Sequence, residues 1–213
     1  MAPRAYALAL AAAIIAPGTL HAQFEFIEPT ALEEQALEQF DRAIDDYVAL
    51  HRRIDRSLPP QRRFDDAEEL FAARHALREG IIRSRPNARR GDVFSPSVSQ
   101  VIRDRLLRAI RWHRHDPADI LADNRAERVP GTAMPEVNEP FPWGLGAAMW
   151  PTLLRVLPEL SEELEYRFVD RDLVLIDMHA NVVVDILSDA LPSADSEDDT
   201  RMECHVEAVE PVS

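Results

Sequence analysis

Residues 164–187 read LEYRFVDRDLVLIDMHANVVVDIL, and this stretch decides the C-terminal part of the fold. Apolar and polar residues alternate over 164–168, and β-branched and aliphatic residues fill the two runs that follow. Both features are typical of strands. Residues 170–172 (DRD) are polar and predict a turn, and a second turn is expected over 178–181, where Asn181 suits a positive φ in the absence of glycine. We therefore predict a three-stranded antiparallel meander.

A sheet of three strands needs a cover over its apolar face. We expect helices upstream to supply it, with the following residues facing them: Tyr166, Phe168, Leu173 and Leu175. The second turn also holds Asp177 and His179, which could pair as acid and base. No nucleophile, glycine-rich loop or third partner accompanies that pair in the sequence. We therefore interpret the stretch as a structural sheet and predict no catalytic residue and no enzymatic activity.

The first predicted helix begins with a capping box, Thr30-Ala31-Leu32-Glu33, in which hydroxyl and carboxylate satisfy free backbone N–H groups. Apolar residues then recur at spacings of three and four as far as Leu58, and Pro59-Pro60 ends the helix. His51 lies on this apolar stripe. We interpret it as a packed histidine with a hydrogen-bonded ring, and a ligand role is the alternative.

Three further helices complete a helical region over residues 29–128. One spans 65–84, with an apolar face made of Ala67, Leu70, Phe71, Leu77 and Ile81. The next begins at Ser95-Pro96, where a hydroxyl residue precedes a proline suited to the first helical position. A short fourth helix begins after Asp116 and ends near Ala126.

Residues 129–161 are rich in proline and glycine. They predict an irregular segment that wraps on the surface, pinned by Trp143 and Trp150, with a short helix over 152–156. The meander, 162–192, would then pack on the helical region as part of one domain. The predicted fold class is α+β.

The N-terminus has the layout of a secretory signal. Arg4 precedes an apolar run of 12 residues, 5–16; Pro17-Gly18 breaks the run, and Ala22 is a small residue before a cut. Twelve helical residues span roughly 18 Å, short of a bilayer core near 30 Å. We expect a signal peptide over 1–22, cleavage near Ala22, and a periplasmic or secreted protein with no transmembrane segment.

The distribution of charged residues along the chain bears on which classes of partner the protein could bind. Residues 42–128 hold 19 arginines and 14 acidic residues, whereas residues 129–213 hold 4 arginines and 18 acidic residues. The acidic half argues against nucleic acid. Residues 193–213 are acidic and poor in large apolar residues, so we predict a disordered tail. The single cysteine, Cys204, excludes a disulfide within the chain, and we interpret it as a passive thiol.

Histidines supply the best candidate for a metal site. His113, His115 and Asp116 offer two imidazoles and a carboxylate. Side chains two apart in a helix point about 200° from each other, so the two histidines can share a metal only if the helix has ended. The alternative is a helix C-terminus at which histidine charge favours the dipole. Cys204-His205 is a second, weaker pair.

Three stretches, 91–96 (GDVFSP), 138–142 (NEPFP) and 157–160 (LPEL) leading into 164–187, together resemble an uncharacterised family of exported bacterial proteins. The resemblance covers about residues 91–192, and Asp170 stands where that family has a glycine in the first turn. It implies export and a helical body with a C-terminal meander, and it brings no known activity, cofactor or site residue. The last hairpin is also similar, more weakly, to that of the periplasmic nickel/cobalt-homeostasis protein.

These features together predict a non-enzymatic accessory or interaction protein of the bacterial envelope, with an envelope protein as its partner. A periplasmic binder or sensor of divalent metal, using His113, His115 and Asp116, is the alternative, and an enzyme of unknown class is the third hypothesis.

Overall fold

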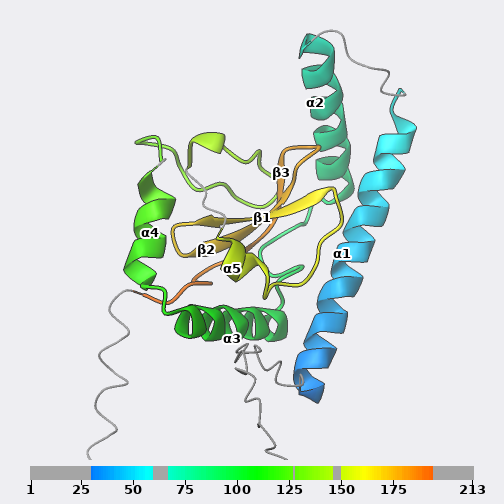
Figure 1. The fold of residues 1–213 in the computed structure, drawn as a ribbon. Coiled ribbons are helices and arrows are strands. Elements are labelled where there is room, and N and C mark those ends of the chain that lie inside the picture. Colours follow the sequence, from blue (N-terminus) through cyan, green and yellow to red (C-terminus); the bar gives the residue numbers. More distant parts are fainter. Residues whose placement is uncertain (1–29, 60–66, 127, 146–149, 194–213) are drawn as a thin grey trace, which may run out of the picture.

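The protein has an α+β fold, seen in a computed structural model that describes residues 30–59, 67–126, 128–145 and 150–193 (Figure 1). Its helices are α1 (Ala31–Ser57), α2 (Ala67–Ser84), α3 (Pro96–His113), α4 (Pro117–Ala126), the 3₁₀ turn η1 (Trp143–Leu145) and α5 (Pro151–Leu154). Among the described helices, none combines the length and apolar character that a membrane span requires. The predicted signal peptide, the acidic tail beyond residue 193 and Cys204 lie outside the described residues.

The predicted meander is confirmed. Strands β1 (Leu164–Val169), β2 (Asp172–Asp177) and β3 (Val182–Leu187) form one antiparallel sheet in the order β1-β2-β3. Both turns contain a residue with left-handed backbone, Asp170 at φ 50° and Asn181 at φ 52°. Aspartate and asparagine tolerate this conformation better than other non-glycine residues. The first turn therefore forms without a glycine.

Helix α1 follows the predicted apolar stripe, and its buried residues are Ala36, Phe40, Ile44, Tyr47, Val48, His51 and Ile54. The Oγ1 of Thr30 accepts a hydrogen bond from the backbone N–H of Glu33 at 3.2 Å, so half of the capping box is formed. The other half is replaced by a tertiary contact, because the Glu33 carboxylate accepts from Nε of Arg105 on α3 at 2.9 Å. The cap thus also joins α1 to α3.

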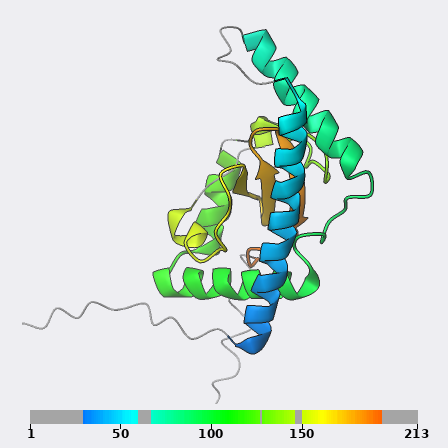
Figure 2. The same ribbon diagram turned by 90° about the vertical axis from the view of Figure 1, so that its right-hand side faces the viewer.

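The main core lies between the sheet and the helices (Figure 2). Tyr166, Phe168, Leu173 and Leu175 all belong to it, as predicted. They pack in one cluster with the buried faces of α1 and α3, and Figure 2 shows α1 passing over the sheet. Burial of such side chains contributes roughly 1.5–3 kcal/mol each, so this cluster is the main source of stability.

The sheet buries its other face as well, which corrects the expectation of a single apolar face. A second cluster joins Val174 and Ile176 of β2 to Phe141 and Leu145 from the proline-rich segment. The residues of β3 are all buried, a pattern expected for a strand covered on both sides. Trp150, predicted to pin the segment, packs against the main core. Trp143, predicted for the same role, is half exposed, and Phe141 is buried in the second cluster instead.

The proline-rich segment also pairs with the free edge of β3 at Val183. The N–H of Val183 donates to the carbonyl of Glu139 and the N–H of Asn138 donates to the carbonyl of Val183, both at 2.9 Å. Asn138 has φ 69°, a left-handed conformation. Unpaired strand edges are prone to aberrant pairing, so this contact protects the sheet.

Helix α2 differs most from prediction. Leu77 and Ile81 are its buried residues, while Leu70 is 44% and Phe71 68% exposed. Figures 1 and 2 both show the first turns of α2 standing away from the sheet. The apolar residues of α2 extend along more of the helix than the part that packs against the rest of the protein. Near its other end α2 approaches α1 so closely that a Cβ on Gly80 would lie 2.5 Å from Cγ2 of Ile54.

Candidate functional site

The most distinctive polar cluster joins α1 to the end of β2. Tyr47 and His51 are one helical turn apart on α1 and therefore share a face. The Tyr47 hydroxyl donates to Oδ2 of Asp177 at 2.8 Å, and Nδ1 of His51 lies 2.5 Å from the same oxygen. The other carboxylate oxygen, Oδ1, accepts from the backbone N–H of Ala180 at 2.8 Å. All three side chains are buried.

Burial and the Asp177 carboxylate together shift the pKa values of His51 and Tyr47. Burial by itself lowers the pKa of His51, but the hydrogen bond and the negative charge of Asp177 oppose it, and the pKa of His51 is raised overall. Burial, followed by the charge of Asp177, raises the pKa of Tyr47 well above its ordinary value. Tyr47 is therefore a neutral hydrogen-bond donor at physiological pH.

The sequence proposed Asp177 and His179 as a pair, and the structure places them differently. His179 is exposed at the second turn, and its ring centroid lies 5.6 Å from that of His51. The partner of Asp177 is His51, which is 126 residues earlier in the chain. The interpretation of His51 as a packed histidine with a hydrogen-bonded ring is confirmed.

A histidine held by a carboxylate is a unit used for general acid–base chemistry when its second nitrogen faces a reacting group. Here the Asp177 carboxylate joins Tyr47 and His51 of α1 to the backbone of the turn after β2. A neighbouring pair reinforces them, because Nε of Arg52 lies 2.5 Å from Oε1 of Glu163, just before β1. Burial opposes the ionisation of Glu163, yet the Arg52 hydrogen bond lowers its pKa to about 2. We interpret this cluster as a structural tie between helix and sheet.

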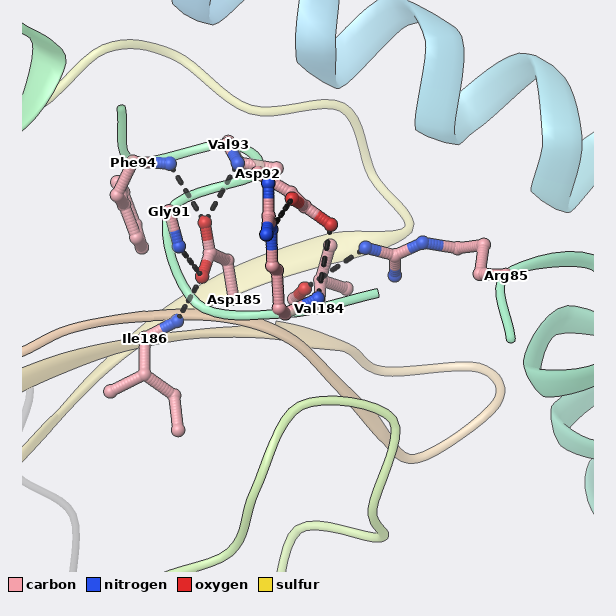
Figure 3. Close-up of polar contacts among 9 residues, drawn as sticks. Arg85, Gly91, Asp92, Val93, Phe94, Val184, Asp185 and Ile186 are labelled. Carbon is pink, nitrogen blue, oxygen red and sulfur yellow. Dashed lines mark hydrogen bonds and ion pairs between the residues drawn. The ribbon is translucent and has the colours of Figure 1, made fainter. Parts of the chain in front are cut away.

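A second buried carboxylate, Asp185 on β3, was missed from the sequence (Figure 3). Oδ2 of Asp185 accepts from the N–H of Val93 at 2.7 Å and of Phe94 at 2.8 Å, and Oδ1 accepts from the N–H of Gly91 at 2.9 Å. Its own strand contributes one more donor, the N–H of Ile186. Asp185 thereby fixes the segment that leads into α3.

A β-bulge explains how Asp185 comes to point at that segment. The register places Leu175 opposite Asp185 but Ile176 opposite Val183, so one residue of β3, Val184, is extra. After a bulge, alternation between the two faces shifts by one residue. Strict alternation would have turned Asp185 to the opposite face. Burial raises the pKa of Asp185 overall, although four backbone hydrogen bonds act in the lowering direction.

A shared metal site requires that the helix end between His113 and His115 and that three ligand side chains gather in one place. The structure meets the first requirement and not the second. Helix α3 ends at His113, and Arg114 has a left-handed backbone at φ 53°. This turn brings the rings of His113 and His115 to 5.6 Å between centroids. However, Asp116 uses Oδ1 to accept from the N–H of Ala118, and the ring of His115 contacts Thr152 and Trp150. Across the described residues, no three His, Cys, Asp or Glu side chains gather as a metal site requires.

A groove of about 500 Å³ runs between α1 and α3. Apolar atoms make up most of its lining surface, and these uncharged polar residues lie among them: Thr30, Gln35, Gln39, Ser97 and Gln100. Ala36 and Val101 supply apolar surface, and Leu32 at the start of α1 is 79% exposed beside it. Clefts that hold ligands combine apolar surface with a few convergent polar groups. The groove has this composition, and it could not be predicted from the sequence because its walls come from two helices.

None of the known protein families, curated proteins or solved structures matches this chain. The resemblance of residues 91–192 to an exported bacterial family stays a prediction, as does the similarity of the last hairpin to the nickel/cobalt-homeostasis protein.

Proposed function

We propose that the protein is a non-enzymatic accessory protein of the bacterial envelope that binds a segment of a partner protein in the groove between α1 and α3. The groove, with its volume of about 500 Å³, is the observation that carries the proposal. The buried Asp177 cluster and the buried Asp185 serve as scaffold in this account, since their hydrogen bonds join elements of the chain to one another.

The chemistry of the groove suits a polypeptide. Amide side chains both donate and accept hydrogen bonds, and three line the groove: Gln35, Gln39 and Gln100. The Oε1 of Gln39 accepts from Ser95 and Ser97, and the Nε2 of Gln100 donates to Asp104, so each of these two amides keeps its other polar atom for an occupant. A peptide backbone offers the same two kinds of group at every residue. Ala36 and Val101 can receive small apolar side chains between these contacts.

The three charged residues that line the groove, Glu33, Asp104 and Arg108, each have a partner within the protein. Glu33 contacts Arg105 at 2.9 Å and Arg108 at 3.5 Å, and Asp104 accepts from Gln100 at 3.0 Å. Contacts of this kind leave a groove in which shape and hydrogen bonding, more than net charge, select the occupant. We expect an uncharged segment of the partner to bind.

Affinity capture from an envelope extract tests the proposal. The bait is the chain from Gln23 onward, and a groove-filling variant, Gln100→Trp, is run beside it. Gln100 is exposed, so the added ring occupies the groove without entering the core. Arg111→Trp is the matched control, because it adds the same ring to an exposed position of α3 outside the groove.

A partner retained by the parent and by Arg111→Trp, and lost from Gln100→Trp, supports the groove as the binding surface. Equal retention by all three baits contradicts it. The envelope location is tested separately by N-terminal sequencing of the protein from cell fractions. The expected product is an envelope protein that begins near Gln23, and a cytoplasmic product that keeps Met1 would contradict export.

Divalent-metal binding at His113 and His115 is the second candidate, favoured by the approach of their rings to 5.6 Å once α3 has ended. Isothermal titration with Ni²⁺ or Zn²⁺ on the purified chain decides it. Micromolar binding lost in both His113→Ala and His115→Ala supports the candidate. Binding that survives both substitutions, or no binding by the parent, removes it.

A further inference from the structure

The groove between α1 and α3 has one end at the N-terminus of α1. Thr30, the N-cap of the helix, lines the groove, and α1 then runs beside it as far as Gln39. Leu32, on the first turn of α1, is 79% exposed at the same end. The residues that precede Thr30, 23–29 (QFEFIEP), are therefore tethered at the rim of the groove. A short tether holds a segment beside its site at an effective concentration in the millimolar range.

The length of this segment matches the length of the groove. From Thr30 to Gln39 the helix rises by about 14 Å, at about 1.5 Å per residue. Residues 23–28 can span up to about 20 Å in an extended chain. Pro29 disfavours helical backbone angles at residue 28, which favours an extended approach to Thr30. The segment is therefore long enough to reverse at Pro29 and follow the groove beside α1.

The apolar side chains of the segment suit the surface of the groove. Alternate side chains of an extended chain lie on one side, so Phe24 and Phe26 would share a side. Apolar atoms make up most of the groove lining, and Ala36 and Val101 can receive the two rings. Docking of the segment would remove this surface, which the described fold leaves exposed, from water.

The charge at the tethered end of the groove is complementary to the segment. Glu28 would lie on the same side as Phe24 and Phe26, next to the tether. Arg108 lines that end, since it contacts Glu33 at 3.5 Å, and its side chain is 51% exposed. A guanidinium has five N–H donors, so Arg108 can keep its contact with Glu33 and also donate to Glu28.

We infer that residues 23–29 of this chain dock in the groove between α1 and α3 and compete there with the partner segment. The inference rests on the proposed function, because it assigns a regulator to the same groove. A partner must displace the tethered segment before it binds. Its apparent affinity is therefore reduced in proportion to the fraction of chains whose groove is open.

Photo-cross-linking tests the docking without any partner. The photoreactive amino acid p-benzoylphenylalanine replaces Phe26 in the chain from Gln23 onward, and mass spectrometry maps the cross-linked residues after illumination. We expect cross-links within one chain to the groove-lining residues of α1 and α3, retained in Arg111→Trp and lost in the groove-filling Gln100→Trp. Cross-links to residues outside the groove, cross-links between two copies, or groove cross-links that Gln100→Trp leaves unchanged would each overturn the inference.

The competition is measured in the affinity capture from the envelope extract. The bait Phe24→Ser/Phe26→Ser should retain more partner than the parent, because its groove is open, and equal retention would overturn the regulatory role. The two proposals fail separately. Groove cross-links without any captured partner remove the proposed function and support the docking. A captured partner that is lost from Gln100→Trp, together with cross-links outside the groove, removes the docking and supports the proposed function.

Discussion

Removal of the Asp177 carboxylate tests the interpretation of the buried cluster as a tie between α1 and the sheet. In Asp177→Ala the Tyr47 hydroxyl, Nδ1 of His51 and the N–H of Ala180 all lose their shared acceptor. Each buried group left without a partner costs about 1–3 kcal/mol, and breaking a buried pair costs about 3–5 kcal/mol in total. That is a large part of the roughly 5–15 kcal/mol that stabilises a domain.

Urea unfolding of the purified chain, followed by circular dichroism, measures the loss. Asp177→Asn keeps the shape and one acceptor oxygen, so we expect an intermediate cost of about 1–3 kcal/mol. His179→Ala is the control at the same turn, where an exposed side chain should change stability by within about 0.5 kcal/mol. The reasoning is refuted if Asp177→Ala unfolds at the urea concentration of the parent, or if His179→Ala is the more damaging substitution.

Three other predictions follow from the packing and the titration of buried groups. Phe168→Ala removes a fully buried ring from the main core and should lower the free energy of unfolding by about 3–5 kcal/mol; a loss below 1 kcal/mol in urea unfolding would be inconsistent with that packing. Gly80→Ala places a methyl group against Ile54. The overpacking should cost about 1–3 kcal/mol of unfolding free energy and outweigh the gain in helix propensity of about 1 kcal/mol. The cost should largely vanish in the Ile54→Ala background, and an equal cost there would argue against the clash. The raised pKa of His51 means that its ion pair contributes fully below the unfolded pKa near 6.5 and that this contribution is lost as pH rises through the folded pKa; His51→Gln should flatten the fall of unfolding free energy with rising pH, and an unchanged slope would contradict the assignment.

Local signals in the sequence predicted the elements well, because they act over a few residues. The Thr30 cap, the proline after Ser95 and the two turns at Asp170 and Asn181 each depend on neighbours within one turn of chain. The same is true of the Asp116 cap, whose carboxylate accepts from the N–H of Ala118 as helix starts of this kind require.

The features that were not predicted from the sequence depend on contacts between distant parts of the chain. No local pattern could pair Asp177 with His51, and the bulge that aims Asp185 at residues 91–94 breaks the alternation by which strand faces are read. An aspartate within an otherwise apolar strand was the available signal, since a buried carboxylate needs partners. Leu70 and Phe71 were expected to be buried because helical periodicity predicts a face and not how much of that face the body covers.

The central claim is that binding occurs in the groove between α1 and α3 while the Asp177 cluster serves as scaffold. The most direct test is the Kd of the captured partner for the parent, Gln100→Trp, Arg111→Trp and His179→Ala, measured by isothermal titration. We predict that Gln100→Trp weakens binding by at least about tenfold, equivalent to about 1.4 kcal/mol, while Arg111→Trp and His179→Ala bind as the parent does. A parent-like Kd for Gln100→Trp, together with loss of binding in His179→Ala, would contradict the claim and place the site at the turn after β2.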